Sequence, residues 1–124
     1  MSRILLIDDD ARTRDLVTAI LQGDGHDVDV ASDGESGIQA ALAGPAPDMI
    51  VTDLNMRGTT GWDVVRRLRA EAQCRSVPIL ALSAFTTAQD RDEAFDAGVT
   101  AYQNKPVDRE RLLAKVTELL NGNR

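Results

Sequence analysis

The chain has 124 residues, of which 43% are hydrophobic and 27% charged, and its formal charge is −6 at pH 7. This length suits one compact domain around one core and leaves no room for a second. The net negative charge argues against nucleic acid or an anionic membrane as the main partner, because both attract basic surfaces. Cys74 is the only cysteine, so an internal disulfide is excluded.

The beginning of the chain shows no sign of a secretion signal, because a strand is expected from Arg3. The longest apolar runs are far too short to cross a bilayer. We therefore expect a soluble, cytoplasmic protein that does not insert into membranes.

The first predicted strand, 3–8, ends on three consecutive acids, Asp8, Asp9 and Asp10. Two carboxylates about 4 Å apart repel by about 4 kcal/mol at an effective dielectric constant near 20, so a folded cluster of them needs a compensating charge. The next predicted element is a helix over 11–23, and Asp10 stands at the position of its N-cap.

The alternation of strand and helix continues along the chain. Hydrophobic periodicity predicts a strand at 27–31, a helix at 33–43, a strand at 48–53, a helix at 61–73, a strand at 77–83, a helix at 87–97, a strand at 100–104 and a helix at 108–121. The runs MIVTD and VPILALS are almost entirely apolar, as is typical of parallel strands covered on both faces. The pattern predicts an α/β fold of five βα units: a doubly wound, flavodoxin-like parallel sheet of order 2-1-3-4-5 with helices on both faces.

Polar residues stand where the predicted strands end. The first strand ends in Asp8 and Asp9, the third in Asp53, the fourth in Ser83, and the fifth runs into Lys105. Parallel strands present their carboxyl ends at one edge of the sheet, so these groups are expected to converge on a single cleft.

Carboxylates without a neighbouring histidine or cysteine suit a hard cation, and Mg²⁺ fits such a small set of ligands better than Ca²⁺. One aspartate of the cluster can then act as a nucleophile toward phosphorus. Lys105 would neutralise charge on the phosphoryl group, and Ser83 would donate a hydrogen bond to it.

Four motifs, LLIDDD, IVTDLNM, ALSA and AYQNKP, resemble in order and spacing the receiver domain of two-component response regulators, particularly single-domain, chemotaxis-type regulators. The resemblance spans essentially the whole chain, so residues 1–124 are expected to form one receiver domain with no output domain. It implies a phosphorylation-dependent switch of a phosphorelay rather than an enzyme. The only catalysis implied is the domain's own phosphorylation and autodephosphorylation.

The resemblance also implies a role for each acid. Asp53 would be the phosphoacceptor, and Asp9, Asp53 and the backbone carbonyl of Asn55 would bind Mg²⁺. Asp8 would contribute charge and water-mediated contacts to the metal site, whereas Asp10 falls outside it.

Three residues on the last two strands complete the implied machinery. Ser83 matches the hydroxyl that turns toward the phosphoryl group, and Tyr102 matches the aromatic residue that swings inward with it. Lys105 matches the lysine that precedes a cis proline, here Pro106.

Two positions near the site raise separate questions. Arg57 stands where the family commonly has proline, and its effect on metal affinity or donor recognition has no predicted sign. Phe85 is expected to hinder the hydrolytic water and so to lengthen the phosphorylated lifetime.

The resemblance implies a sensor histidine kinase or a phosphotransfer protein as donor, an unidentified protein effector, no direct contact with nucleic acid, and a dimer linked to phosphorylation as a further possibility. The helix at 87–97 can bury little beyond Phe95 and alanines, which is typical of a switching element. With the strand that carries Tyr102 and the last helix, it forms the candidate output face.

Other residues are assigned to packing or to solvent. Trp62 is expected to be half-buried, and His26 is expected on the surface. A basic run is expected to form a solvated face; it comprises Arg66, Arg67, Arg69 and Arg75.

Two alternatives stay open at this point. The segment IDDDART also loosely resembles phosphatases of the haloacid dehalogenase type, with Asp8 as nucleophile and Asp10 as acid/base, although Arg12 departs from that pattern and Asp53 would have no role. The second alternative is a receiver-like scaffold that binds partners without phosphorylation.

Overall fold

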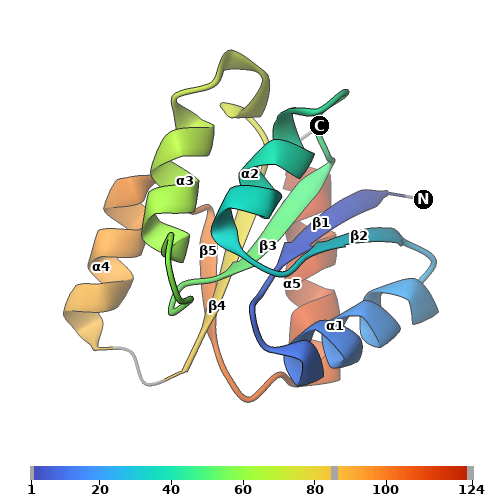
Figure 1. Ribbon diagram of the computed structural model, residues 1–124. Helices are drawn as coiled ribbons and strands as arrows, with labels where there is room; N and C mark the ends of the chain where they lie inside the picture. Colours follow the sequence, from blue (N-terminus) through green and yellow to red (C-terminus); the bar gives the residue numbers. More distant parts are fainter. Residues whose placement is uncertain (1, 85–86, 123–124) are drawn as a thin grey trace.

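The computed structural model describes residues 2–84 and 87–122. Its five strands form one parallel sheet of order β2-β1-β3-β4-β5, and helices cover both faces (Figure 1). The elements are β1 (Arg3–Ile7), α1 (Ala11–Gly23), β2 (Asp27–Ala31), α2 (Gly34–Leu42), β3 (Met49–Asp53), α3 (Gly61–Arg69), the 3₁₀ helix η1 (Ala72–Cys74), β4 (Ile79–Ser83), α4 (Ala88–Ala97), β5 (Ala101–Asn104) and α5 (Arg109–Gly122). The predicted fold class and strand order are confirmed. Within the described ranges, no helix combines the length and apolar character needed to cross a membrane.

Alternation of side chains along the strands divides the core into two layers. Ile4 and Leu6 of β1 pack with residues of α1 and α5, whereas Leu5 and Ile7 pack with residues of α2, α3 and α4. Figure 1 shows these two groups of helices on opposite sides of the sheet. Because successive strand residues point to opposite faces, a sheet covered on both sides requires the unbroken apolar runs seen in the sequence.

Capping side chains start the helices just beyond the carboxyl ends of the strands. Asp10 caps α1 by accepting a hydrogen bond from the Arg12 N–H, as predicted. Asp33 caps α2 in the same way, and Thr60 caps α3. Each cap satisfies a backbone donor that the helix itself cannot satisfy.

The helix predicted at 61–73 is shorter than expected, because α3 ends at Arg69. The Arg69 guanidinium donates hydrogen bonds to the carbonyl oxygens of Gly98, Cys74 and Val77 at 2.9, 2.7 and 2.7 Å. These bonds hold the chain that follows α3, which forms η1, against the guanidinium, and β4 starts at Ile79 rather than at the predicted residue 77. The expectation that Arg69 belongs to a solvated basic face was therefore wrong.

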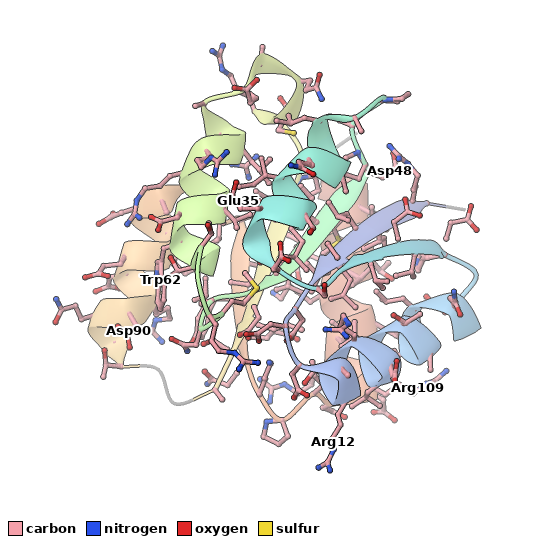
Figure 2. All side chains as sticks on the ribbon, in the orientation of Figure 1. Arg12, Glu35, Asp48, Trp62, Asp90 and Arg109 are labelled. Carbon is pink, nitrogen blue, oxygen red and sulfur yellow. The ribbon has the colours of Figure 1, made fainter. Side chains whose placement is uncertain are left out.

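The α4 helix is weakly buried, as its composition predicted, but not in the way expected. Ala94 and Ala97 are buried, whereas Phe95 is 46% exposed and packs outside the core. Half-buried Trp62 points from α3 toward α4, and its indole N–H donates to the Asp90 carbonyl at 3.1 Å (Figure 2). This bond ties the first turn of α4 to α3.

His26 was expected on the surface, and this expectation was wrong. Its side chain is only 12% exposed, and its Nε2 atom lies 3.5 Å from the Asp24 carboxylate. The residue follows α1 at the amino edge of the sheet, far along the strands from the acids that end β1.

The beginning of α3 lies directly against the end of β3. A Cβ atom on Gly61 would lie 2.1 Å from the Asp53 carbonyl oxygen and 2.6 Å from the Leu54 Cα atom. The Gly61 N–H also donates to the Leu54 carbonyl at 2.9 Å. This close backbone approach, which only glycine permits, closes the loop over residues 54–60.

We expect Gly61→Ala to lower the free energy of unfolding by about 1–3 kcal/mol, because the added methyl group must push rigid backbone apart. Gly44→Ala is the matched control, since a Cβ atom there meets nothing within 4 Å and the backbone needs no left-handed conformation. Urea unfolding of both variants measures the difference. Equal stability of the two variants would contradict this account of Gly61.

Candidate functional site

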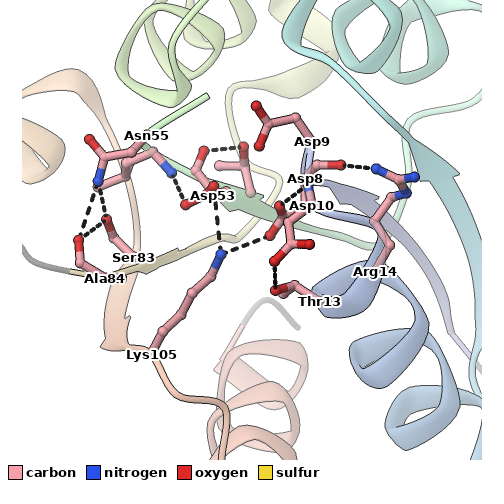
Figure 3. Close-up of polar contacts among 12 residues, drawn as sticks. Asp8, Asp9, Asp10, Thr13, Arg14, Asp53, Asn55, Ser83, Ala84 and Lys105 are labelled. Carbon is pink, nitrogen blue, oxygen red and sulfur yellow. Dashed lines mark hydrogen bonds and ion pairs between the residues drawn. The ribbon is translucent and has the colours of Figure 1, made fainter. Parts of the chain in front are cut away.

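A cleft of about 390 Å³ opens at the carboxyl edge of the sheet. It is lined by residues from the ends of β1, β3, β4 and β5: Asp9, Asp10, Asp53, Asn55, Ala84 and Lys105. The convergence expected from the strand order is thus present in the fold, as Figure 3 shows.

Three acids form the centre of the site. Asp8, Asp9 and Asp53 each offer a carboxylate oxygen, and these oxygens lie within 4.8 Å of one another. Lys105 Nζ lies 3.1 Å from Asp8 Oδ2 and 3.6 Å from Asp53 Oδ2 (Figure 3). The lysine therefore supplies part of the compensating charge that the acidic run requires.

Asp8 is fully buried and held from several sides. Its Oδ1 atom accepts the Asp10 N–H at 2.9 Å, and its backbone carbonyl accepts a hydrogen bond from Arg14 Nη1 at 2.8 Å. Arg14 was not predicted to belong to the site; its place one turn after the N-cap of α1, on the side toward β1, is the feature of the sequence that could have indicated it. These bonds leave Asp8 as a fixed negative charge behind the cleft, which it does not line.

Asp10 belongs to α1 rather than to the acid cluster. It accepts hydrogen bonds from the Thr13 hydroxyl and the Arg12 N–H, both at 3.1 Å. The Thr13 bond, followed by the Arg12 bond, holds the pKa of this carboxyl below its usual value. Asp10 thus lies at the rim of the cleft as an ionised helix cap.

Asp53 is 5% exposed and accepts the Leu54 N–H through Oδ1 at 2.8 Å. Burial raises the pKa of this carboxyl, and the negative charge of Asp8 raises it further, against the opposing effect of Lys105. The ionised form is therefore costly here, and a further positive charge in the cleft would stabilise it.

Ser83 is contacted from two sides. Asn55 Nδ2 donates to Ser83 Oγ at 2.9 Å and to the Ala84 carbonyl at 3.3 Å. Burial raises the pKa of Tyr102, and a hydrogen bond between the Tyr102 and Ser83 side chains acts against that rise. From the sequence, only the backbone carbonyl of Asn55 was expected to take part in the site, so this contact of its side chain was not predicted.

Arg57 contacts Asp9 twice, through its backbone N–H at 3.1 Å and its guanidinium Nε at 3.8 Å, both to Oδ2. The Lys105–Pro106 peptide bond is cis, as the resemblance implied. Phe85, for which a role in excluding water was expected, lies outside the described residues.

The donor set fits a magnesium ion. The oxygen ligands come from carboxylates, and two of the three acids, Asp9 and Asp53, line the cleft and can face a bound ion. Mg²⁺ prefers such oxygen ligands, takes only one or two carboxylates and keeps several of its waters.

A doubly wound sheet with acids and a lysine gathered at its carboxyl edge defines a class of signalling domain. The sequence model of the response regulator receiver domain matches residues 4–117, and the chain belongs to this family. It is a receiver domain of a two-component response regulator.

Curated relatives align with nearly the whole chain. The DNA-binding dual master transcriptional regulator RpaA of Synechocystis sp. is 42% identical over 120 residues, which cover 97% of this chain and 49% of the relative. The DNA-binding response regulator MtrA of Mycobacterium tuberculosis is 36% identical over 121 residues, or 98% of this chain and 51% of the relative. The chain spans about half the length of the curated relatives it matches.

Solved structures share the fold. The chemotaxis response regulator CheY4 of Vibrio cholerae is 31% identical, with a TM-score of 0.90 over 96% of this chain and 98% of that one. The receiver domain of the sensor histidine kinase PA1611 from Pseudomonas aeruginosa is 28% identical, with a TM-score of 0.89 over 97% of this chain and 98% of that one. That structure holds a magnesium ion coordinated in its active site cleft.

We expect Asp53→Asn to raise the free energy of unfolding at pH 7, by on the order of 1 kcal/mol, because it removes a charge that burial and Asp8 disfavour. Since the pKa of Asp53 is raised in the folded chain, ionised Asp53 destabilises the fold above that pKa. This cost disappears as the pH falls through the raised pKa toward the usual value of 3.8, so the advantage of the variant shrinks in that window.

Urea unfolding of both proteins between pH 7 and pH 4, with a chelator present, measures this difference. Asp10→Asn is the control of opposite sign, because the pKa of Asp10 is lowered and its ionised form stabilises the fold. An Asp53→Asn protein that is less stable than wild type at pH 7 would contradict the assignment.

Proposed function

We propose that this receiver domain accepts a phosphoryl group on Asp53 in a Mg²⁺-dependent reaction and so switches the surface it offers to a partner. The position of Asp53 on the wall of the cleft, beside Lys105, carries this proposal. Asp53 lines the cleft, whereas the neighbouring Asp8 is buried behind it and bonded to Lys105 and the Asp10 N–H. A nucleophile must be within reach of its substrate. Of the two acids that face Lys105, only Asp53 lines the cleft.

The transfer requires one bond to form and one to break. The Asp53 carboxylate attacks the phosphorus atom of a phosphohistidine on a sensor kinase or phosphotransfer protein, or that of a small phosphodonor. The bond from phosphorus to the leaving nitrogen or oxygen breaks, and its electron pair stays with the leaving group. Lys105, 3.6 Å from Asp53 Oδ2, neutralises charge on the transferred group.

We assign the metal ligands to Asp9, Asp53 and the backbone carbonyl of Asn55, with Asp8 adding charge and water-mediated contacts. When bound, Mg²⁺ supplies positive charge to the oxygens of the phosphoryl group and the acids. The raised pKa of Asp53 supports this assignment, because a second positive charge beside Lys105 would stabilise the ionised nucleophile.

The switch follows from the contacts of Ser83. Its hydroxyl accepts from Asn55 Nδ2 and donates to the Ala84 carbonyl at 3.4 Å, so it must turn away from that carbonyl in order to donate to a phosphoryl oxygen on Asp53. This turn would also change its contact with the Tyr102 side chain. The α4 helix, which buries little more than Ala94 and Ala97, can respond to this change at low cost. We therefore propose α4, β5 and α5 as the output face, whose partner must prefer the phosphorylated conformer.

The partners are proposed on the same basis. A sensor histidine kinase or phosphotransfer protein donates the phosphoryl group, and a protein effector or a second phosphorylated copy binds the output face. The net charge of −6 supports a domain that does not itself bind nucleic acid.

The phosphatase alternative is not favoured. Its nucleophile would be Asp8, which does not line the cleft, and its acid/base would be Asp10, which the first turn of α1 holds as an ionised cap. A phosphorylation-independent scaffold would leave the buried Asp53 and its lysine without a role.

Intact mass measured after incubation with acetyl phosphate tests the acceptor. We expect wild type to gain one phosphoryl group with Mg²⁺ and none with a chelator, and Asp53→Asn to gain none. Asp10→Asn is the matched control and should label like wild type, because that residue caps α1. Labelling that survives Asp53→Asn but is lost in Asp8→Asn would support the phosphatase instead.

The switch is tested by hydrogen exchange. We expect phosphorylation to change the exchange of α4 amides in wild type, and Ser83→Ala to accept phosphate while losing most of that change, because the hydroxyl is the link between the site and Tyr102. An unaltered α4 response in labelled Ser83→Ala would contradict this route.

A further inference from the structure

The charges of the acid cluster are shared between two cations of the chain. Lys105 Nζ faces Asp8 and Asp53 at 3.1 and 3.6 Å. The third acid, Asp9, is instead contacted by Arg57, whose Nε lies 3.8 Å from Asp9 Oδ2. Arg57 thus supplies the positive charge that Lys105 does not bring to Asp9.

The Arg57 contact is built to be reversible. The Arg57 side chain is 95% exposed and the Asp9 side chain 22% exposed, so water and salt compete for the ion pair. The contact also has a second part, because the Arg57 N–H donates to the same Oδ2 atom at 3.1 Å. This backbone bond does not depend on the side chain and holds the loop near Asp9 when the guanidinium leaves.

We propose that the Arg57 guanidinium is an internal competitor for the divalent cation of this site. It neutralises Asp9 when the carboxylate is otherwise unpaired, and its positive charge opposes a cation that approaches the same oxygen. This inference rests on the metal binding of the proposed function and goes beyond it by assigning a residue that sets the metal affinity. Its sign is definite: removal of the guanidinium charge tightens Mg²⁺ binding.

The competition is electrostatic, so charge rather than shape must decide the effect. Arg57→Gln removes the charge and keeps the backbone N–H, whereas Arg57→Lys keeps a positive charge on a flexible side chain at the same place. Arg12→Gln is the matched control: it removes one charge from the same end of the sheet, but this side chain points out from α1 (Figure 2) and lines a groove with Thr13 and Leu16 rather than the cleft that Asp9 lines.

Isothermal titration with MgCl₂ on wild type and these three variants, without phosphodonor, tests the inference. We expect Arg57→Gln to lower the Kd for Mg²⁺ by about three- to tenfold at low ionic strength, from the Coulomb energy of a unit charge beside a divalent ion in water. The gain should shrink as NaCl is raised, because salt screens exposed charges. Arg57→Lys should bind close to wild type, and Arg12→Gln should gain clearly less than Arg57→Gln.

The inference would be overturned if the Kd of Arg57→Gln were equal to or above that of wild type, or no lower than that of Arg12→Gln. The absence of Mg²⁺ binding in all four proteins would overturn it as well. The mass measurement separates this failure from failure of the proposed function. Phosphorylation of Asp53 with unchanged Mg²⁺ affinity in Arg57→Gln removes only the role of Arg57, whereas tighter Mg²⁺ binding without phosphorylation removes only the acceptor role.

Discussion

Mutual repulsion of carboxylates at one edge of the sheet is the constraint on which the rest of the site depends. A parallel sheet gathers the ends of β1 and β3, so Asp8 and Asp53 meet whether or not their charges favour it. Lys105, 97 residues from Asp8 in the chain, offsets this repulsion from the end of β5. The offset is incomplete: burial first, and the negative charge of Asp8 second, still raise the pKa of Asp53 against the effect of Lys105. Because the negative charge of the cluster is only partly offset, the cleft would stabilise a bound divalent cation.

The loop after β3 contacts this cluster and the strand end that carries Ser83. It is closed at its far end by the contact of Gly61 with the Asp53 carbonyl, and it offers two exchangeable contacts in between. Asn55 bonds Ser83 on one side of the cleft, and Arg57 bonds Asp9 on the other. Both contacts involve groups for which a phosphoryl group or a cation would compete. One loop therefore connects the proposed chemistry to the metal and to the switch.

The α4 helix shows how a weakly held element can still have a defined position. Its apolar contribution to the core is small, but a capping box formed by Thr87 and Asp90 orders its first turn. The Trp62 bond to the Asp90 carbonyl then joins that turn to α3. Polar contacts of this kind are directional and individually modest in energy. They suit the role proposed for α4, in which the helix keeps one position until phosphorylation releases it.

Features that depend on local pattern were determined by the sequence itself: the five βα units, the strand order through the rules of chain crossover, the Asp10 cap, and the acids, hydroxyl and lysine at the strand ends. Tertiary structure decided those that depend on a partner distant in the chain. Nothing near Arg69 indicates that it binds the Gly98 carbonyl, and nothing near Asn55 indicates Ser83. Phe95 was expected to be buried because it is apolar, yet it is 46% exposed. An apolar side chain is buried only where another part of the fold covers it. Hydrophobic periodicity indicates which side of a helix or strand is apolar. A polar contact between residues distant in the chain depends on where the fold places both segments, which no local pattern of the sequence determines.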